Sequence, residues 1–486
     1  MIFLEDNLFT KFLNLMSKNI TESDLELIKL GESLGLNLIS FADLRHSQDD
    51  SFIDGVRSEA LKKLENKKSN VLTQHDTFYV GSIDFMVSNA ENDKKFFLLE
   101  TNGGSHRGLS ILTTKQQEML YRGYYQAIEH AIQEKKQETE KVLILIGLPV
   151  DDRLIHEKVI MIEYLRKRLK KEGFSLKIFN IDNYDSKHKA ELIFLVADYN
   201  QISPHISYSD NWVKFKEENV HVLIGDGIAR RFNDKTFNAH VINNYREINT
   251  VIVNPIFKIT DDKSLTYLAG SFSQEVLSEF NLRHLMFTKC FSEKKLLQKL
   301  LILINKEQKS FIIKPSGGSG GTGVLVVSQS QNKKDIRRII KTSQKEFYDK
   351  FGDQRNPFPY TIQELADFCL INWRGEKHTY DLRIYVAQIN GIIQPIGGLA
   401  RISRGSYING EKKQEFVVNL SGFNGQIEVT RGLGFSKPNA TILGLQREDF
   451  VDLFCISCII FRNIVNNYEN IIKFSNWEKI IKFYSL

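Results

Sequence analysis

The spacing of apolar residues changes along the chain, and each change predicts a different kind of structure. Residues 1 to about 70 place apolar side chains at helical intervals, as in SDLELIKLGESLG, and predict helices. Apolar and polar residues then alternate in FYVGSIDFMVS and KKFFLLETN, on either side of the polar segment NAEND. This pattern predicts two antiparallel strands between residues 78 and 102, followed by a helix from about Thr113 to Lys136.

Short apolar runs alternate with helical patterns from about residue 140 to 250. KVLILIGLP, LKIFNI, ELIFLVAD and HVLIGDG are typical of buried strands, and HEKVIMIEYLRKRLKKEG is typical of an amphipathic helix. Such alternation predicts a small α/β domain with a parallel sheet.

The region from about residue 251 mixes both patterns. Helices are predicted near Glu293 to Asn305 and Lys333 to Phe351, and strands at FIIK, GVLVV, YTIQEL, DLRIYVAQI, GIIQPIGGLARI and EFVVNL. The last ~50 residues are predicted to be helical again. Because Cys455 and Cys458 lie in the apolar run FVDLFCISCIIF, we expect them to be core residues rather than redox groups or zinc ligands.

Composition excludes several classes of protein. A chain of 486 residues with 42% hydrophobic and 26% charged residues is expected to form two or three globular domains. The net charge of +6 is small for this length, and no basic cluster is interleaved with aromatic residues, so a nucleic-acid partner is not indicated. Four cysteines, no apolar run near ~18 residues and no signal peptide predict a cytoplasmic protein without a membrane span.

A glycine-rich turn, FIIKPSGGSGGTGVLVV, is the first candidate for chemistry. It contains the spacing G-x-G-x-x-G at Gly318, Gly320 and Gly323, but it leads from one strand into another, whereas a dinucleotide-binding turn leads into a helix. A bare backbone lets N–H groups approach phosphate oxygens, and Lys314 adds a cation at the end of the first strand. We interpret the turn as a phosphate-binding hairpin; the alternative is a flexible surface hairpin.

The predicted hairpin between residues 78 and 102 carries two carboxylates. A register centred on Asn92 places Asp84 opposite Glu100, and Asn102 points to the same face as Glu100. Two carboxylates at cross-strand distance repel each other unless a cation lies between them, and Mg²⁺ prefers such oxygen ligands. We interpret the three side chains as a magnesium site; the alternative is an edge strand with solvent-facing acids.

Basic and amide side chains lie on the later strands. Asp381, Arg383 and Tyr385 share one strand face, Arg401 ends the next strand and Asn419 ends a third. Arginines on a sheet face stabilise a transferring phosphoryl group or hold a carboxylate. For either arginine taken singly, this binding role is not favoured over the alternative, a structural ion pair such as Asp381 with Arg383.

Taken together, these motifs resemble the ATP-grasp superfamily. The resemblance rests on the glycine-rich hairpin with its lysine, the segments Q-E-L, D-L-R, G-G-L-A-R and V-N-L, and the D…E-x-N pair. Here D…E-x-N comes before the glycine-rich turn, an order similar to the circularly permuted, glutathionylspermidine synthetase-like amide ligases. The segment NPIFKITDDKSLTYL is similar to the family's segment before the glycine-rich turn.

The resemblance implies a role for each matching residue, with ATP and Mg²⁺ as the bound groups. Lys314 would contact the phosphates, with Lys263 or Lys289 as a second lysine, and Arg383 and Arg401 would face the triphosphate and the acyl phosphate. Phosphate contacts are implied at Gly318, Gly320, Gly321 and Gly323, and Asn419 would lie near the phosphates or the metal. An adenine hinge is implied at Gln363, Glu364 and Leu365, with Glu364 accepting from the exocyclic amine, and Mg²⁺ ligands at Asp84, Glu100 and Asn102. One departure is Ser82, which stands where many of these ligases have an arginine.

The resemblance also implies the fold and its division. We expect an α/β (α+β) protein with an ATP-grasp fold in circularly permuted order. The expected regions are a helical N-terminal part (1–75), a permuted ATP-grasp segment (76–138), a pre-ATP-grasp-like parallel α/β domain (139–250), the nucleotide-binding subdomains (251–435) and C-terminal helices (436–486).

The function that these expectations favour is an ATP-dependent carboxylate–amine ligase acting through an acyl phosphate. Its partners would be a small-molecule or peptide carboxylate and an amine. His106 and Arg107, in the loop after Asn102, suit a substrate carboxylate, although an ordinary polar loop explains them equally well. Alternatives are an ATP-grasp kinase, a nucleotide-binding or scaffold protein without turnover and, more weakly, a dinucleotide-dependent enzyme. The oligomeric state stays open, and a dimer is compatible with the sequence.

Overall fold

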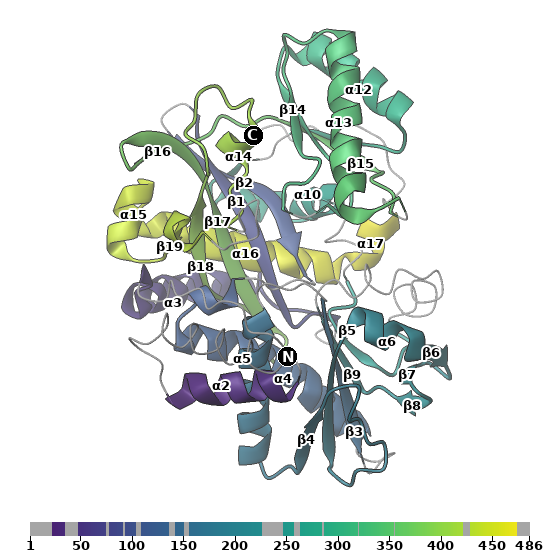
Figure 1. Ribbon diagram of the computed structural model, residues 1–486. Helices are drawn as coiled ribbons and strands as arrows, with labels where there is room; N and C mark the ends of the chain where they lie inside the picture. Colours follow the sequence, from purple (N-terminus) through teal and green to yellow (C-terminus); the bar gives the residue numbers. More distant parts are fainter. Residues whose placement is uncertain are drawn as a thin grey trace, which may run out of the picture.

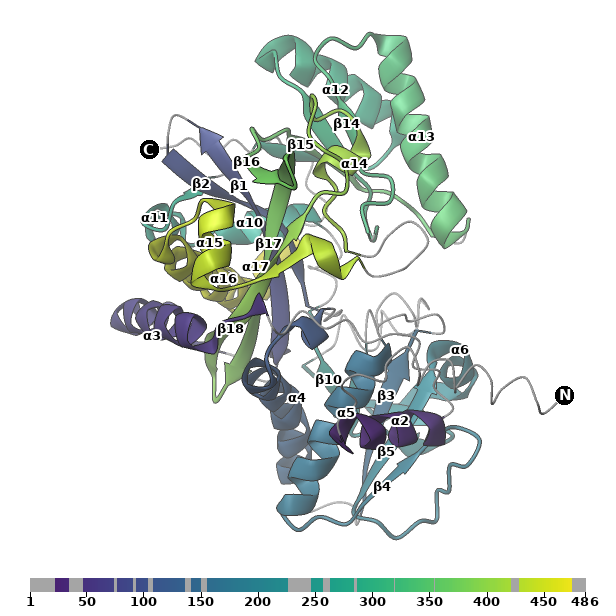
Figure 2. The same ribbon diagram turned by 60° about the vertical axis from the view of Figure 1, so that its left-hand side comes forward.

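Three sheets with their helices form the body of the molecule (Figure 1). In the computed structural model the described residues are 22–34, 47–73, 77–90, 93–103, 108–135, 141–149, 155–225, 246–256, 263–283, 286–318, 320–353, 355–420 and 428–473. A central, largely antiparallel sheet lies between a smaller sheet with two long helices and a parallel sheet, as the turned view makes clear (Figure 2).

The central sheet has the strand order β11-β2-β1-β17-β18-β19, with β16 also paired to β17. Segments almost 300 positions apart meet here, because β1 pairs with β2 on one side and with β17 on the other. The strands are β1 (Val80–Ala90), β2 (Asp93–Asn102), β11 (Leu282–Arg283), β16 (Leu370–Trp373), β17 (Glu376–Ile389), β18 (Ile392–Ile402) and β19 (Gly432–Gly434).

One face of the central sheet is apolar and covered by helices from both ends of the chain. Alternate residues of β1, such as Ile83, Phe85 and Val87, are buried against α3 (Asp50–Lys67) and α16 (Arg447–Asn466) in one hydrophobic core. The helices α2 (Glu22–Ser33), α15 (Lys437–Leu443) and α17 (Tyr468–Lys473) complete the terminal parts. Cys455 and Cys458 lie in α16 as buried, free thiols, so the expectation that they are core residues is confirmed.

The predicted parallel α/β domain is present. Its sheet has the order β10-β9-β3-β5-β4, and all described pairings in it are parallel. The strands are β3 (Val142–Leu148), β4 (Leu176–Phe179), β5 (Leu192–Asp198), β9 (Val222–Gly225) and β10 (Val251–Val253). The helices α4 (Thr114–Lys135) and α5 (Ile155–Lys171) share a core with this sheet and with part of the central sheet.

A small antiparallel sheet interrupts the parallel domain between β5 and β9. It consists of β6 (Ile206–Ser209), β7 (Trp212–Phe215) and β8 (Glu218–Asn219), preceded by the short helix α6 (Tyr199–Ile202). The sequence analysis did not predict this sheet, because its strands are short and their polar tips lack a long alternating pattern.

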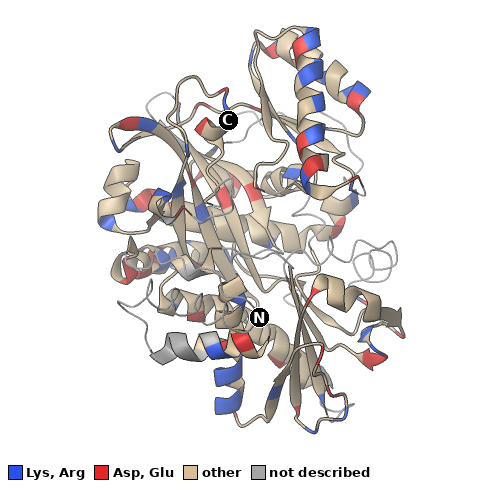
Figure 3. Ribbon diagram, in the orientation of Figure 1, with Lys and Arg blue, Asp and Glu red and all other residues tan. Residues whose placement is uncertain are grey.

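A four-stranded antiparallel sheet of order β12-β15-β13-β14 carries the glycine-rich turn. Its strands are β12 (Phe287–Cys290), β13 (Phe311–Lys314), β14 (Leu325–Val327) and β15 (Tyr360–Glu364). The helices α12 (Glu293–Glu307) and α13 (Lys333–Phe351), both predicted from their periodicity, cover one face through apolar residues. Lys and Arg residues recur along α13, whose buried residues are mainly apolar (Figure 3).

Two details of the predicted strands need correction. EFVVNL was predicted as a strand, but its first part is the helical turn α14 (Lys413–Phe416) and the rest pairs with no described strand. The carboxylate of Glu415 accepts hydrogen bonds from the backbone N–H groups of Ile408, Asn409 and Gly410, which holds this segment as a compact loop. In the first hairpin, a bulge shifts the register by one residue between Asp84 and the turn.

The fold class expected from the sequence, a mixed α/β protein, is confirmed by the combination of parallel and antiparallel sheets with helices. Within the described ranges, no helix is both long and apolar enough to cross a bilayer.

Two helical glycines provide a matched test of this packing. A Cβ on Gly123 of α4 would lie 2.7 Å from the backbone oxygen of Tyr79, whereas a Cβ on Gly55 of α3 would meet only the mobile end of the Arg447 side chain, at 3.0 Å. We expect Gly123→Ala to lower the free energy of unfolding by about 1–3 kcal/mol through overpacking. Gly55→Ala is expected to be neutral or to stabilise by up to about 1 kcal/mol through helix propensity. Denaturant unfolding measures both, and equal effects would contradict the close α4–β1 packing.

Candidate functional site

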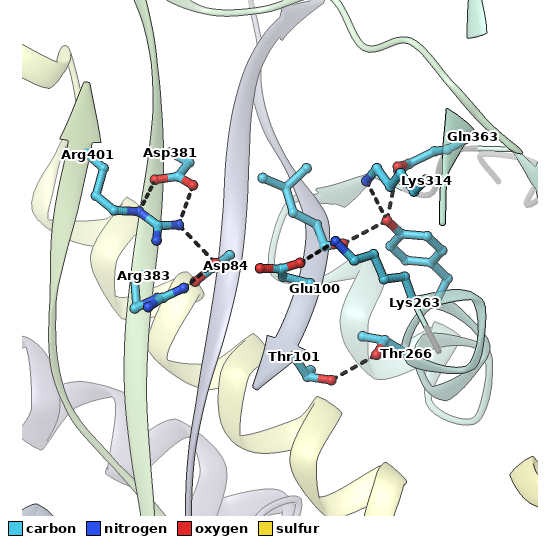
Figure 4. A network of polar contacts seen from close by, with 12 residues as sticks. Asp84, Glu100, Thr101, Lys263, Thr266, Lys314, Gln363, Asp381, Arg383 and Arg401 are labelled. Atoms are coloured by element: carbon cyan, nitrogen blue, oxygen red, sulfur yellow. Dashed lines mark hydrogen bonds and ion pairs between the residues drawn. The ribbon is translucent and has the colours of Figure 1, made fainter. Parts of the chain in front are cut away.

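A row of charged side chains crosses the polar face of the central sheet. Asp84 on β1 lies opposite Glu100 on β2 and opposite Arg383 on β17, so the predicted Asp84–Glu100 pairing is confirmed. Figure 4 shows these side chains together, with Lys263 beyond Glu100 and Arg401 beyond Arg383. Because facing residues of paired strands share one side of a sheet, the pairing of β1 with β2 and with β17 brings the three charges together.

Asp84 is buried between two guanidinium groups. Its carboxylate accepts hydrogen bonds from Nε and a terminal nitrogen of Arg383, both at 2.7 Å, and from a terminal nitrogen of Arg401 at 2.8 Å. Burial alone would raise the pKa of Asp84, but the two guanidinium groups outweigh it and hold that pKa well below its usual range. Asp84 is therefore a carboxylate at any physiological pH.

Asp381 completes the buried cluster. It faces Arg401 across β17 and β18, and Arg401 Nε donates to its carboxylate at 2.8 Å. The suggested pair of Asp381 with Arg383 was wrong, since residues two apart on a strand stand side by side while cross-strand partners meet head-on. Burial raises the pKa of Asp381 to about 6, although Arg401 acts in the opposite direction. Arg401 is thus shared by two carboxylates.

Oxygen atoms with unused lone pairs gather beside this cluster. Glu100 uses one oxygen for an ion pair with Lys263 at 2.7 Å, and its other oxygen accepts no hydrogen bond from the described residues. Among the described residues, the side chain of Asn102 has no hydrogen-bond partner, although its Nδ2 is buried. The buried Oγ of Ser82, which lies directly opposite Asn102, has no partner among them either. Asp84 Oδ1 accepts a hydrogen bond from Arg383 Nε.

This donor set fits a hard divalent cation. Oxygen atoms of two carboxylates and one amide match the ligands that Mg²⁺ takes, and each has lone pairs to spare. The described residues hold no cluster of three His, Cys, Asp or Glu side chains, so carbonyl, water or substrate oxygens would have to complete the coordination.

The four-stranded sheet contributes a second polar face, built from lysines. Lys289 and Lys314 both pair with Thr361, from opposite sides, and Gln363 follows two residues later on the same face. Lys314 is 6% exposed, and its ammonium donates to the hydroxyl of Tyr267 at 2.8 Å. Burial, with help from Lys263, lowers the pKa of Lys314 to about 7. Its amine is therefore poised to gain a proton when an anion arrives.

The helix α10 (Lys263–Ser271) joins the two polar faces. Lys263 pairs with Glu100, Thr266 Oγ1 lies 2.8 Å from Thr101 Oγ1, and Tyr267 reaches both β2 and the lysine sheet. The sequence analysis named Lys263 but missed Tyr267. The available signal was the i,i+4 spacing of the two residues, which places them on one helix face.

The glycine-rich turn folds onto the segment after α14. Gly320 and Gly321 have positive φ angles of 64° and 72°, and a Cβ on Gly321 would lie 2.7 Å from Val417. Only glycine fits so close a contact in this conformation. Gly318 and Gly323 belong to the same turn, and the Gly323 N–H donates to the carboxylate of Glu346 at 3.0 Å. A loop N–H thus already holds an anionic group.

The residues implied as an adenine hinge lie at the end of β15. Gln363 Oε1 is 3.0 Å from the Tyr267 hydroxyl, and the Leu365 N–H donates to Ser310 O at 3.0 Å. The carboxylate of Glu364 forms an ion pair with Lys309 and accepts from Met286 N–H at 3.4 Å. The Glu364 side chain is therefore engaged within the protein, as are the backbone N–H groups of Glu364 and Leu365.

The other predicted residues divide into two groups. Asn419 lies beside the turn, with Nδ2 3.0 Å from where a Cβ on Gly320 would be, and its backbone oxygen accepts from Arg431 at 2.6 Å. His106 and Arg107 lie outside the described residues. The helix α13, which the sequence analysis did not connect with the site, supplies Lys350 to Thr322 at 3.0 Å and Glu346 to Gly323.

Comparisons with known proteins show distant similarity to solved structures. No protein-family model matches the chain, and no curated protein matches it. A solved structure of a glutathione synthetase-like effector from Globodera pallida, in its apo form, is similar over 78% of this chain and 83% of the other, with 10% sequence identity and a TM-score of 0.38. A similarity this distant assigns no activity, so the function rests on the site itself.

The two facing carboxylates predict unequal effects on stability. Asp84→Asn leaves two buried guanidinium groups with less compensation, and we expect it to lower the free energy of unfolding by about 3–5 kcal/mol. Glu100→Gln breaks a partly exposed ion pair, for which about 1 kcal/mol or less is expected. Denaturant unfolding without nucleotide compares them. Equal losses would contradict the buried Asp84 cluster.

Proposed function

We propose that the chain is an ATP-dependent carboxylate–amine ligase with an ATP-grasp site in circularly permuted order. The observation that carries the proposal is the facing of two complementary surfaces. One surface has Lys314, Lys289 and the glycine-rich turn, and the other has Asp84, Glu100 and the two arginines. Cations that suit phosphates thus face oxygen donors that suit a divalent ion, and α10 bridges them.

The four-stranded sheet would bind the nucleotide. The adenine ring would lie at the end of β15, where Gln363 to Leu365 leave the sheet, and the phosphates would extend toward Lys314. Lys289, which lies across Thr361 from Lys314, and Lys263, which is near the Lys314 ammonium, would add further cations. The turn from Gly317 to Gly323, held by α13 and Val417, would cover the phosphates with backbone N–H groups.

The oxygen donors on the central sheet would hold the metal. Asp84, Glu100 and Asn102 would bind Mg²⁺, which would supply positive charge between the phosphate oxygens. Release of Lys263 from Glu100 would free this cation for the triphosphate, since the two share an ion pair in the ligand-free protein.

The chemistry requires positioning and charge stabilisation rather than a protein nucleophile. A substrate carboxylate oxygen attacks the γ-phosphorus of ATP. The bond between this phosphorus and the β–γ bridging oxygen breaks, so the products are an acyl phosphate and ADP. An amine then attacks the acyl carbon, loses a proton and expels phosphate, which gives an amide. Arg383 and Arg401 would neutralise the charge that develops on the transferred phosphoryl group.

Nucleotide binding is tested by thermal stability. We expect saturating Mg-ATP to raise the melting temperature of the parent, because a ligand that binds the folded state stabilises it by mass action. Glu100→Gln and Lys314→Met should reduce the shift strongly, whereas Lys306→Met, which removes an exposed cation of α12, should leave it unchanged. Equal shifts in all four proteins would place any nucleotide elsewhere, and no shift in the parent at millimolar Mg-ATP would remove the proposal.

Ligation is separated from its alternatives by product analysis. Panels of carboxylates and amines are incubated with Mg-ATP, and phosphate and amide are measured together. Phosphate release that needs both an acid and an amine supports the ligase. A phosphorylated product that accumulates without an amine would instead establish a kinase, and binding without turnover over a broad panel would favour a nucleotide-binding protein.

Nucleotide affinity should depend on pH through Lys314. Its pKa of about 7 in the free protein will rise when phosphate oxygens surround the ammonium, so binding above pH 7 takes up a proton. We expect affinity to be constant below pH 7 and to fall by up to about tenfold per unit above it. Titration calorimetry in two buffers measures affinity and proton uptake. Lys314→Arg, which stays charged, should flatten the profile, and a flat profile in the parent would contradict this role.

A further inference from the structure

Tyr267 occupies the contact between the two polar faces of the site. Its ring is 6% exposed and packs at 5.1 Å from that of Phe287. Its hydroxyl lies 2.7 Å from the backbone oxygen of Leu99, 3.0 Å from Gln363 Oε1 and 2.8 Å from the Lys314 ammonium. One oxygen atom therefore touches the metal hairpin, the strand of the hinge and the phosphate-binding lysine.

The surroundings make this hydroxyl a fixed point. Lys263 and Thr266 of the same helix hold Glu100 and Thr101, the two residues that follow Leu99 on β2. Three contacts from one helix to three successive β2 residues fix its position against the hairpin. Of these three α10 side chains, Tyr267 also reaches the lysine sheet, where the Lys314 ammonium lies 5.5 Å from the centre of its ring.

We propose that Tyr267 is a positioning residue that sets the place of Lys314 relative to the metal hairpin through its hydroxyl. The inference rests on the proposed nucleotide site and adds a residue to it. A lysine on a four-carbon stem has many rotamers, and a buried oxygen acceptor limits them to one. Without that acceptor, the ammonium has to find another partner or move away, and the two halves of the site lose a shared reference point.

The test compares two tyrosine-to-phenylalanine variants. Tyr267→Phe removes the hydroxyl at the site, and Tyr360→Phe removes a hydroxyl on β15 that lies 2.9 Å from Ser343 Oγ. We expect Tyr267→Phe to weaken Mg-ATP binding about tenfold at pH 7, as for loss of a hydrogen bond to a charged group. The pH at which affinity begins to fall should also move lower, because the ammonium has lost an oxygen acceptor. Tyr360→Phe should change neither quantity.

Lys314→Met shows whether Tyr267 acts through the lysine. If it does, Tyr267→Phe lowers the affinity for Mg-ATP in the parent but has little further effect in the Lys314→Met background. The other charged groups near this ammonium, Lys263 and Glu100, are unchanged in all four proteins of the cycle. Equal effects of Tyr267→Phe in the two backgrounds, or an unchanged affinity and pH profile in the parent, would overturn the inference.

A measurement without nucleotide keeps the two proposals distinct. If the parent does not bind Mg-ATP, the proposed function fails, and the same four proteins are compared by denaturant unfolding. Non-additive losses that grow as pH falls and Lys314 gains its proton would still support positioning of Lys314 by Tyr267. Additive losses at every pH would overturn it, while an Mg-ATP shift in the parent would leave the proposed function standing.

Discussion

The buried ion cluster on the central sheet is the constraint on which the site depends. The carboxylates of Asp84 and Asp381 balance the guanidinium charges of Arg383 and Arg401, and these side chains are at most 12% exposed. Removing charges from water is costly, and their attraction compensates only when the geometry supplies a hydrogen bond for nearly every donor. The cluster therefore needs β1, β17 and β18 in this register, and a slip by one residue would send the charges into the apolar core on the other face.

The same constraint separates two kinds of carboxylate that the sequence presents alike. Asp84 is held by two arginines, whereas Glu100 pairs with one lysine and its other oxygen accepts no hydrogen bond from the part of the chain that the structure describes. In the ligand-free protein, Glu100 is the more available acid, and Asp84 serves first as an anchor for the arginines. A cation between the two would draw on Asp84 without releasing it from Arg383, because its Oδ1 retains a lone pair.

Local patterns predicted much of the fold, and they failed where long-range pairing decides the structure. Alternation and the polar turn predicted that Asp84 faces Glu100, but the pairing next to the turn is offset by one residue, and the bulge after Asp84 is what restores the predicted register. The helices α12 and α13 followed from their apolar periodicity. Nothing local indicates that β1 pairs with β17, and this pairing decides which acid each arginine meets; Asp381 was assigned the wrong partner for that reason. Tyr267 was not predicted, because a tyrosine in an apolar stretch of sequence resembles a core residue until the position of its hydroxyl is known.

The net charge of the two facing surfaces indicates the kind of ligand that the site would bind. The side chains on the two facing surfaces are the cations Lys263, Lys289, Lys314, Arg383 and Arg401 and the anions Asp84, Glu100 and Asp381. When every cation is protonated, the site has an excess of positive charge on the order of two, which a nucleoside triphosphate with one bound Mg²⁺ would neutralise. Without a ligand, burial lowers the pKa of Lys314 to about 7, with help from Lys263, so that part of the excess is absent near neutral pH. An anion bound beside Lys314 would favour its protonated form and offset the positive charge at the same time.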